Sequence, residues 1–247
     1  MITRIESLSA LPLPQDPFTL RIVSTAEAYG LSTVFLDVWQ GNGCLFSRMD
    51  GVLTIAGKPD PHDMEETALF AASCGAGQIF CAPDTAQTLG LSLKEMGPVL
   101  YRDQPAGEVP LWEELPSPRV LYEVLAACEG EGFPVPEFEP FYLDTSHRLR
   151  HGTAKAVVLH ENGQPAACAL ALAVTQNAAL LTAVAVLPDF RRKGLGQQAV
   201  EALCRKLPGR RVFLFRSETE NKEFYESLGF SLWGEWGSSS PFSPSDV

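Results

Sequence analysis

A short run in the second half of the chain has the residue types and spacing that suit binding of a diphosphate. A strand-like segment ends at Val186, and Arg191-Arg192-Lys193-Gly194-Leu195-Gly196 then leads into an expected helix. The first turn of a helix has free backbone N–H groups, and the helix dipole adds roughly half a positive charge there. Glycine lets the backbone approach a ligand, and the basic side chains add fixed positive charge. The run therefore predicts an anion-binding site.

Two other interpretations of this run are open. A solvated basic turn would carry the same charges, but it would not need Gly-x-Gly before a helix. The spacing Gly194-x-Gly196-x-x-Ala199 also satisfies a dinucleotide fingerprint, and Arg216 after the next strand could bind a 2′-phosphate. Against this NADP alternative, several residues separate the strand from the first glycine, antiparallel hairpin signals precede it, and too little chain follows for a doubly wound sheet.

Alternating strand and helix signals surround the run and would position it. Asn162-Gly163 between two apolar segments is typical of a tight hairpin. An apolar stripe recurring every four residues from Leu195 indicates a helix, which Pro208-Gly209 should end. We expect strands over residues 155–160, 167–174, 179–186, 212–215 and 230–233, and a further short helix over residues 221–228.

The stretch from residue 166 to residue 188 is nearly all apolar, and as a helix it would be long enough to cross a bilayer. Thr175, Gln176 and Asn177 interrupt its middle, and such residues are typical of turns. We therefore expect two buried strands joined by a tight turn, and no membrane partner.

Residues 155–233 resemble the GNAT acetyltransferase superfamily. The coenzyme motif of that family, Arg/Gln-x-x-Gly-x-Gly/Ala after the fourth strand, matches Arg191, Gly194 and Gly196. The later segment Phe224-Tyr225-Glu226-Ser227-Leu228-Gly229-Phe230 resembles the Tyr-x-x-x-Gly-Phe segment of the family. The two motifs have the order and spacing of the family, and the surrounding strand pattern agrees.

The resemblance implies an α/β (α+β) fold with a mixed, mostly antiparallel central sheet flanked by helices. Strands four and five should splay apart, with acetyl-CoA in the resulting V and no metal required. The backbone of Val184, Ala185 and Val186 should bind the pantetheine arm. The residues expected around the pyrophosphate are Arg191, Arg192, Lys193, Gly194, Leu195, Gly196 and Gln197. Tyr225 matches the family's general acid toward the leaving thiolate, although its ring could equally pack in the core.

One position departs from the family pattern. Many members have asparagine seven residues before the tyrosine, where this chain has Glu218. Asn221 could take over the coenzyme contact, or it could cap the following helix. Glu218 or Glu220 could act as a general base, or could simply place negative charge at a helix start.

A second polar cluster lies between residues 142 and 151. Tyr142, Asp144 and His147 could border the acceptor site, since His147 or Asp144 could deprotonate an amine. The same residues, with Arg148, Arg150 and His151, could instead form a solvated helix surface.

The first half of the chain repeats this plan weakly. Residues 88–93 resemble residues 227–232, and Asp50-Gly51 is another hairpin signal. We expect strands over residues 44–47, 52–56 and 78–82, and helices over residues 64–74 and 85–89. The acidic segment Lys58-Pro59-Asp60-Pro61-His62-Asp63 stands where a Gly-x-Gly loop would be expected. The sequence thus predicts a degenerate GNAT-like domain (1–104), a linker (105–118), a catalytic domain (119–237) and a flexible tail (238–247), although two helix ends could also resemble each other by chance.

Composition limits the remaining possibilities. The formal net charge of −11 argues against a nucleic-acid partner, and it could steer a cationic amine or serve only solubility. Six cysteines without a Cys-x-x-Cys pair, and an N-terminus without a leader pattern, predict a cytoplasmic protein without a zinc site. The sequence favours an N-acetyltransferase that moves an acetyl group from acetyl-CoA to a primary amine, with a small molecule favoured over a peptide. It would act as a monomer or homodimer, and the alternative is a non-catalytic CoA-binding sensor or scaffold.

Overall fold

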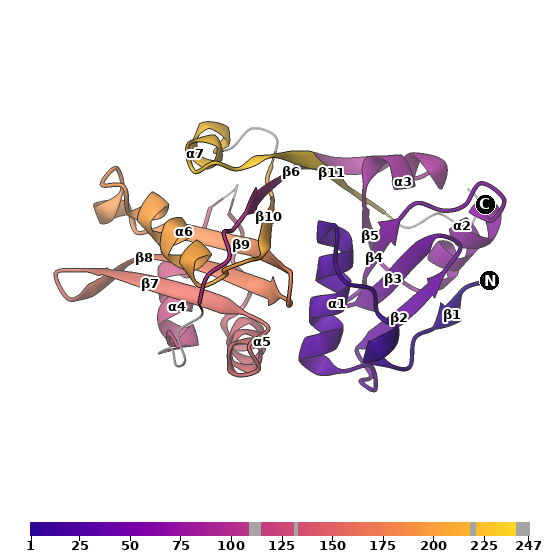
Figure 1. Cartoon of the computed structure of the whole chain (residues 1–247), viewed down its shortest axis with the longest axis horizontal. Helices are drawn as coiled ribbons and strands as arrows, with labels where there is room; N and C mark the ends of the chain where they lie inside the picture. The colour runs from indigo at the N-terminus through magenta and orange to yellow at the C-terminus, as the bar shows by residue number, and fades with distance from the viewer. Residues whose placement is uncertain (109–114, 131–132, 218–220, 241–247) are drawn as a thin grey trace. The chain divides into compact units, whose positions relative to one another are not determined.

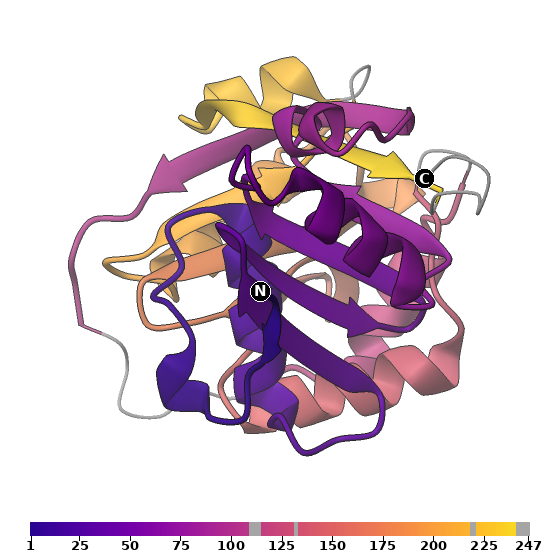
Figure 2. The ribbon, with the colours of Figure 1, turned by 90° about the vertical axis from the view of Figure 1, so that its right-hand side faces the viewer.

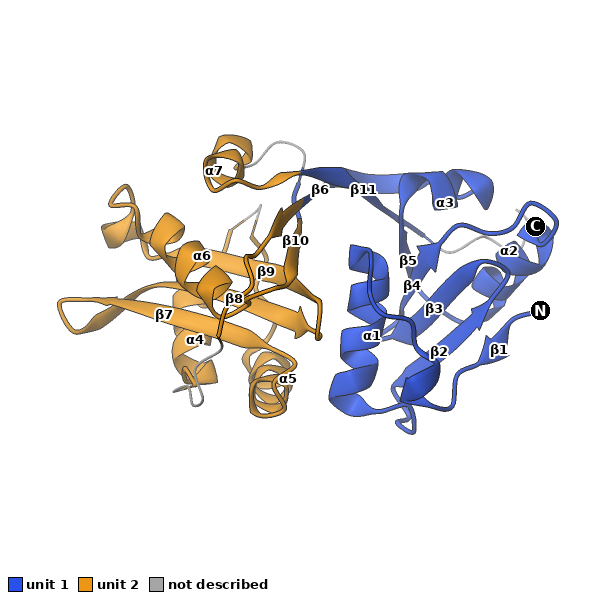
Figure 3. Cartoon of the chain, in the orientation of Figure 1, with its two compact units in different colours: residues 1–100, 215–220, 232–247 blue, residues 101–214, 221–231 orange. Residues whose placement is uncertain are grey.

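The computed structural model describes residues 1–108, 115–130, 133–217 and 221–240. The chain forms two compact units, coloured blue and orange in Figure 3. Unit 1 contains residues 1–100, 215–220 and 232–247, and unit 2 contains residues 101–214 and 221–231. These units divide the chain differently from the expected domains, because segments near the C-terminal end pack within unit 1. That the two halves are related tandem domains stays a prediction.

In unit 1 the strand pairs β1–β2, β2–β3, β3–β4 and β5–β11 are antiparallel, and the pair β4–β5 is parallel (Figure 1). The order of its strands is β1-β2-β3-β4-β5-β11-β6. Its elements are β1 (Thr3–Arg4), η1 (Leu8–Ala10), α1 (Pro17–Tyr29), β2 (Leu36–Gly41), β3 (Cys44–Met49), β4 (Val52–Gly57), α2 (Met64–Ser73), β5 (Gln78–Cys81), α3 (Pro83–Thr88), most of β6 (Leu93–Asp103) and most of β11 (Ser231–Ser239).

Helices α1 and α2 cover opposite faces of this sheet, as Figure 2 shows with α2 in front. On β3, Leu45 packs in the cluster that contains Phe18 and Ile22 of α1. Its neighbour Phe46 packs in the other cluster, with Ala71 of α2. Successive side chains of a strand point to opposite faces, so the apolar run Cys44-Leu45-Phe46 at the start of β3 reflects burial on both sides.

Unit 2 contains the remaining helices and strands in the order β6-β10-β9-β8-β7, with only the last residues of β6. In this unit, strands β7, β8 and β9 pair antiparallel with one another, and β9 and β10 pair in parallel. Its elements are α4 (Pro118–Ala126), α5 (Phe138–Arg150), β7 (Lys155–Glu161), β8 (Gln164–Val174), β9 (Ala178–Val186), η2 (Pro188–Phe190), α6 (Leu195–Arg205), β10 (Arg211–Phe215) and α7 (Lys222–Ser227). The sequence prediction of a mixed, mostly antiparallel sheet flanked by helices is confirmed.

The helices of unit 2 also form two layers. Leu121 of α4 and Phe141 of α5 share a core cluster with Cys168 and Ala185 of the sheet. Helix α6 packs against β7, β8 and β9 through the stripe that the sequence predicted, and its first turn contacts Val186, the neighbour of Ala185. Because neighbouring residues of a strand face opposite sides, α6 lies on the face opposite α4 and α5.

The turn signals in the sequence have the expected geometry. Asn162-Gly163 has φ values of 52° and 78°, and Asp50-Gly51 has 49° and 74°. Positive φ at both central residues is the requirement of a type I′ hairpin turn. The segment from 166 to 188 forms β8 and β9, joined by a turn at the expected place. Among the described residues, no helix is both long enough and apolar enough to cross a membrane.

Several elements differ from the expectations. Helix α1 was not predicted, although Asp16 caps it by accepting hydrogen bonds from Phe18 and Thr19. The sequence indicates a short helix over residues 141–150, whereas α5 begins at Phe138; Pro140 lies in its first turn, where a missing N–H costs no hydrogen bond. Strand β11 runs to Ser239, into the expected tail, because its last residues pair with Ile79 and Phe80 of β5.

Candidate functional site

Strand β9 leaves β10 about halfway along its length. The parallel pairing ends at Leu214↔Leu181, whereas β9 stays paired with β8 as far as Ala167↔Val186. Thr182 is skipped in the register with β8, and its Oγ1 donates to the carbonyl of Leu170 at 2.9 Å. Such a bulge bends a strand. The edge of β9 from Thr182 to Val186 is therefore open on the side of β10.

The peptide groups along this open edge alternate in direction. The N–H of Leu187 donates to the carbonyl of Ala166 on β8 at 2.9 Å. The carbonyl of Val186, in the same trans peptide group, therefore points away from β8. By the same alternation, the N–H and C=O groups of Val184 and Val186 face the open edge, and those of Ala185 face β8. The structure thus brings two of the three predicted strand contacts to this edge.

The loop after β9 ends in a helix start that is rich in free donors. Gly194 is the N-cap of α6, with φ 77° and no side-chain cap. The first hydrogen bond of the helix runs from Gln198 N–H to the carbonyl of Gly194, at 3.1 Å. Within the described part of the chain, the backbone N–H groups of residues 192–197 have no acceptor. This is the donor cluster that a phosphate would need.

The basic side chains of this loop are all exposed. Arg191 turns back toward the strand, and its Nε donates to the carbonyl of Val186 at 3.1 Å. The ammonium of Lys193 lies 5.1 Å from the centre of the Phe190 ring and 3.4 Å from the carbonyl of Asp189. These side chains carry positive charge in the loop that leads into α6, where the helix dipole also favours an anion.

Helix α7 packs against the same first turn. A Cβ atom on Gly196 would lie 3.4 Å from Val186 Cγ2 and 3.5 Å from the ring of Phe224. Tyr225, the next residue, is half-buried, with its ring centre 5.0 Å from that of Phe224 and 5.7 Å from that of Phe230. The structure thus places Tyr225 on the helix beside the predicted anion-binding loop (residues 191–196), and its ring also packs against neighbouring aromatic residues.

Asn221 precedes α7 with φ 58°, and its side chain makes no capping hydrogen bond. Of the two roles considered for Asn221, a side-chain cap of α7 is therefore not seen. Glu218 and Glu220 lie outside the described residues.

The second polar cluster lies on α5 and is largely engaged. Asp144 accepts from Arg148 at 2.7 Å, and the buried Arg148 also donates to the carbonyl of Leu172 at 3.2 Å. His147 stacks on His151, with ring centres 4.1 Å apart. Tyr142 is 38% exposed and contacts Phe138. Helix α5 belongs to the layer opposite α6, so the structure does not bring Tyr142, Asp144 or His147 to the anion-binding loop.

Buried thiols complete the chemistry of the chain. All six cysteines are free. Burial raises the pKa of Cys44, Cys81 and Cys168 to about 12, and that of Cys204 to about 11. Such thiols hold their protons near neutral pH and are poor nucleophiles. Among the described residues, no three His, Cys, Asp or Glu side chains lie together as metal ligands would.

Cys128 is a site contact that sequence reasoning missed. It follows α4, and its thiol donates to the carbonyl of Val186 at 3.2 Å. The two residues are far apart in the sequence, and neither the spacing nor the composition near Cys128 indicates this contact.

The dinucleotide alternative is wrong, since η2 and the basic loop separate β9 from Gly194, and antiparallel strands precede it.

Comparisons with known proteins agree with this geometry. The family model described as "Acetyltransferase (GNAT) family" matches residues 119–230. No curated protein sequence matches the chain. Similar solved structures include a GCN5-related N-acetyltransferase from Kribbella flavida, with TM-score 0.58, 17% identity and coverage of 91% of this chain and 96% of that one.

Two further structures cover nearly the whole chain. A GNAT-family acetyltransferase from Colwellia psychrerythraea has TM-score 0.56 and 13% identity, covering 98% of this chain and 100% of that one. A tandem GNAT protein from the clavulanic acid biosynthesis pathway has TM-score 0.51 and 15% identity, with coverage of 95% and 91%. At these identities the likeness concerns the fold, whereas the family model concerns the sequence around the site. Residues 119–230 of this chain are an acetyltransferase domain of the GNAT family.

Proposed function

We propose that the protein transfers an acetyl group from acetyl-CoA to a primary amine, with the coenzyme held between β9 and the start of α6. One observation carries this proposal: beyond the open edge of β9, η2 and a short loop bring the chain to the unpaired N–H groups of residues 192–197. Coenzyme A has an amide-containing arm followed by a diphosphate. The edge offers strand-like hydrogen bonds to the arm, and the helix start offers donors to the diphosphate.

The residues proposed for coenzyme binding divide into two groups. Val184 and the N–H of Val186 serve the arm, because their peptide groups face the open edge. The donors at residues 192–197 serve the diphosphate, and the charges of Arg191, Arg192 and Lys193 raise its local concentration. Asn221, whose side chain does not cap α7, remains a candidate for a further coenzyme contact.

We propose direct transfer without an acyl-enzyme. Acetyl-CoA supplies the activated acetyl thioester. Backbone N–H groups on the open edge polarise the carbonyl that is attacked. Tyr225 passes its phenolic proton from Oη to the departing sulfur, and a base or ordered water takes the proton of the amine. A cysteine nucleophile is disfavoured, because burial raises the pKa of Cys44, Cys81, Cys168 and Cys204.

The first half of the chain is proposed to be a degenerate copy of the GNAT domain that shapes acceptor binding. Support comes from the coverage of nearly the whole chain by GNAT structures, one of which is titled a tandem GNAT protein. The net charge of −11 favours a cationic amine, and we propose a small molecule in the cytoplasm as the acceptor.

Gly194→Glu tests the coenzyme site. The substitution puts bulk and negative charge among the donors, so we expect at least a hundredfold weaker binding of CoA and acetyl-CoA. Gly194 has φ 77°, so any side chain there also strains the backbone. Gly209→Glu is the matched control, because Gly209 has φ 69°, has open space around it and follows the other end of α6.

The measurement is a thermal-shift titration with CoA, acetyl-CoA and NADPH, since a ligand that binds the folded state raises Tm. We expect both forms of the coenzyme, but not NADPH, to stabilise the wild type and Gly209→Glu, and neither to stabilise Gly194→Glu. Equal stabilisation of the two variants would remove the assignment. Release of free thiol from acetyl-CoA in an amine screen then separates an enzyme from a non-catalytic CoA sensor.

A further inference from the structure

The carbonyl of Val186 lies where β9 ends and the anion-binding loop begins. Its oxygen points to the open edge, because the adjacent N–H of Leu187 is bonded to Ala166 of β8. The pairing with β10 has already ended at Leu181, so β10 supplies no donor here. A backbone carbonyl left without a partner in a half-buried position costs free energy. The opening of the sheet therefore creates a need for other donors at this oxygen.

Two side chains from different segments meet that need. The thiol of Cys128 donates from 3.2 Å, and the Nε of Arg191 donates from 3.1 Å. A carbonyl oxygen has two lone pairs and can accept both bonds. Cys128 follows α4, whose helix packs beneath the sheet, and Arg191 belongs to the loop. One oxygen thus joins the strand end, the α4 layer and the loop.

We propose that Cys128 and Arg191 are positioning residues that fix the direction of the coenzyme donors by holding the Val186 carbonyl. The bond from Arg191 closes the loop over η2 and fixes where the N–H groups of residues 192–197 begin. The bond from Cys128 holds the end of β9 against α4, so that the opened strand does not drift. A site built from backbone donors depends on such support, since small displacements weaken every bond to the ligand. This inference rests on the proposed coenzyme site.

Matched pairs of variants isolate the hydrogen bond from charge and size. Cys128→Ser keeps a donor that Cys128→Ala lacks. Arg191→Gln and Arg191→Met both remove the charge, and only glutamine keeps an N–H donor. Cys204→Ala is the control, because it removes a buried thiol from α6 of the same unit that has no bond to β9.

The measurements are the Kd of CoA by calorimetry and Tm without ligand. We expect Cys128→Ala to bind CoA about three- to tenfold more weakly than Cys128→Ser. The same difference is expected between Arg191→Met and Arg191→Gln, because each pair differs by one hydrogen bond. Cys204→Ala should lower Tm and leave Kd unchanged.

The outcomes separate this inference from the proposed function. If the wild type binds CoA and both members of each pair bind it within twofold of one another, the positioning role is overturned while the coenzyme site stands. If the wild type binds no CoA, the proposed function fails and the inference fails with it. A fall in Tm without a change in Kd for Cys128→Ala also overturns the inference, because it indicates a structural contact only.

Discussion

The segment between β4 and α2 and the segment between β9 and α6 share one layout but differ in chemistry. In both places a strand pairs in parallel with the next strand and then runs past the end of that pairing. The β4–β5 pairing ends at Thr54↔Phe80 while β4 continues to Gly57, much as β9 continues beyond Leu181. Each strand is followed by a loop and a helix. The two regions can therefore be compared position by position.

The loop before α2 lacks the donors that the loop before α6 offers. Pro59 and Pro61 have no N–H, and the N–H of Asp60 is bonded to the carbonyl of Asn42. The N–H of Asp63 is bonded to the carbonyl of Asp60. The acidic side chains add repulsion toward a phosphate. The two regions thus share a strand–loop–helix layout but differ in the charges and free N–H groups of the loop, and these features come from the loop residues and not from the fold.

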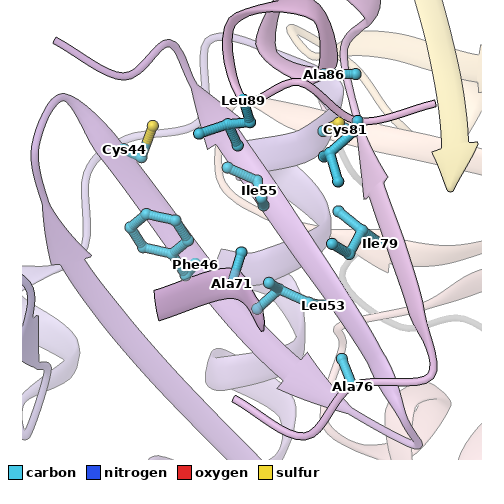
Figure 4. Close-up of a cluster of buried hydrophobic side chains, with 11 residues drawn as sticks. Cys44, Phe46, Leu53, Ile55, Ala71, Ala76, Ile79, Cys81, Ala86 and Leu89 are labelled. Atoms are coloured by element: carbon cyan, nitrogen blue, oxygen red, sulfur yellow. The ribbon is translucent and has the colours of Figure 1, made fainter. Parts of the chain in front are cut away.

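The opening beside β4 is also closed by side chains. Thr85 of α3 is buried, and its Oγ1 donates to the carbonyl of Gly57 at 2.7 Å. Ala86 and Leu89 pack with Ile55 and other residues of the sheet, as Figure 4 shows. Counting back from the Leu-Gly that both halves share, Ala86 stands where Tyr225 stands in the second half. The first half therefore has a methyl group in place of the phenol.

Among the differences between the two halves, the loss of the Tyr225 hydroxyl in Tyr225→Phe should have the largest effect, and that effect should be on kcat. The change removes the proposed general acid, which has no counterpart in the first half, so kcat should fall about a hundredfold. The Kd of CoA should not change. Steady-state thiol release and calorimetry measure the two quantities. Tyr122→Phe, which removes a hydroxyl from the α4 layer, should keep kcat, and an unchanged kcat in Tyr225→Phe would leave only a packing role for that ring.

Thr85→Val should come next in size. Valine keeps the shape and removes the donor, so the buried carbonyl of Gly57 loses its partner and the free energy of unfolding should fall by about 2 kcal/mol. Urea unfolding measures this change. Thr88→Val, at a partly exposed position on the same helix, should cost less than about 0.5 kcal/mol. Coenzyme affinity should stay unchanged in both variants, and a weaker Kd in Thr85→Val would connect the first half to the site.

Charge reversal at paired lysines should have a smaller effect. Lys193→Glu should weaken CoA binding about five- to tenfold at low ionic strength, because Lys193 lies in the loop with free donors, and Lys58→Glu should leave it unchanged. The difference should shrink as salt is added, since both side chains are exposed. Equal effects of the two reversals would mean that overall charge, and not the loop, attracts the coenzyme.

The smallest difference is expected in thiol ionisation, where the two halves behave alike. Burial raises the pKa of Cys44 and Cys81 in one half, and of Cys168 and Cys204 in the other, above the ordinary thiol value of 9.0. The contribution of these buried, protonated thiols to the free energy of unfolding is fully present below pH 9.0, and it is lost as the pH rises toward about 12. At pH 8, titration with a thiol reagent should find these four slow and the half-buried Cys74 and Cys128 faster. Rapid reaction of all six would contradict this burial.

The sequence predicted the start of α6 and the tight hairpin turns better than it predicted the surrounding structure. The Arg191, Gly194 and Gly196 spacing is local, and glycine at a positive-φ helix start is a requirement of the backbone itself. The hairpins at Asn162-Gly163 and Asp50-Gly51 were predictable for the same reason. The full length of β11 was not, because its final residues become a strand only through pairing with β5. Propensity is weak wherever a distant strand supplies the hydrogen bonds.

By itself the sequence determined the elements of local chemistry: where strands turn, where a helix starts without a cap, and which loop is basic or acidic. Only the tertiary structure decided that β9 opens from β10 after Leu181, that Ala185 faces β8 while Val186 faces the opening, and that Cys128 reaches the same carbonyl as Arg191. Turns and helix starts depend on the torsion angles of a few adjacent residues. Strand partners and the direction of a carbonyl depend on which distant segments fold together.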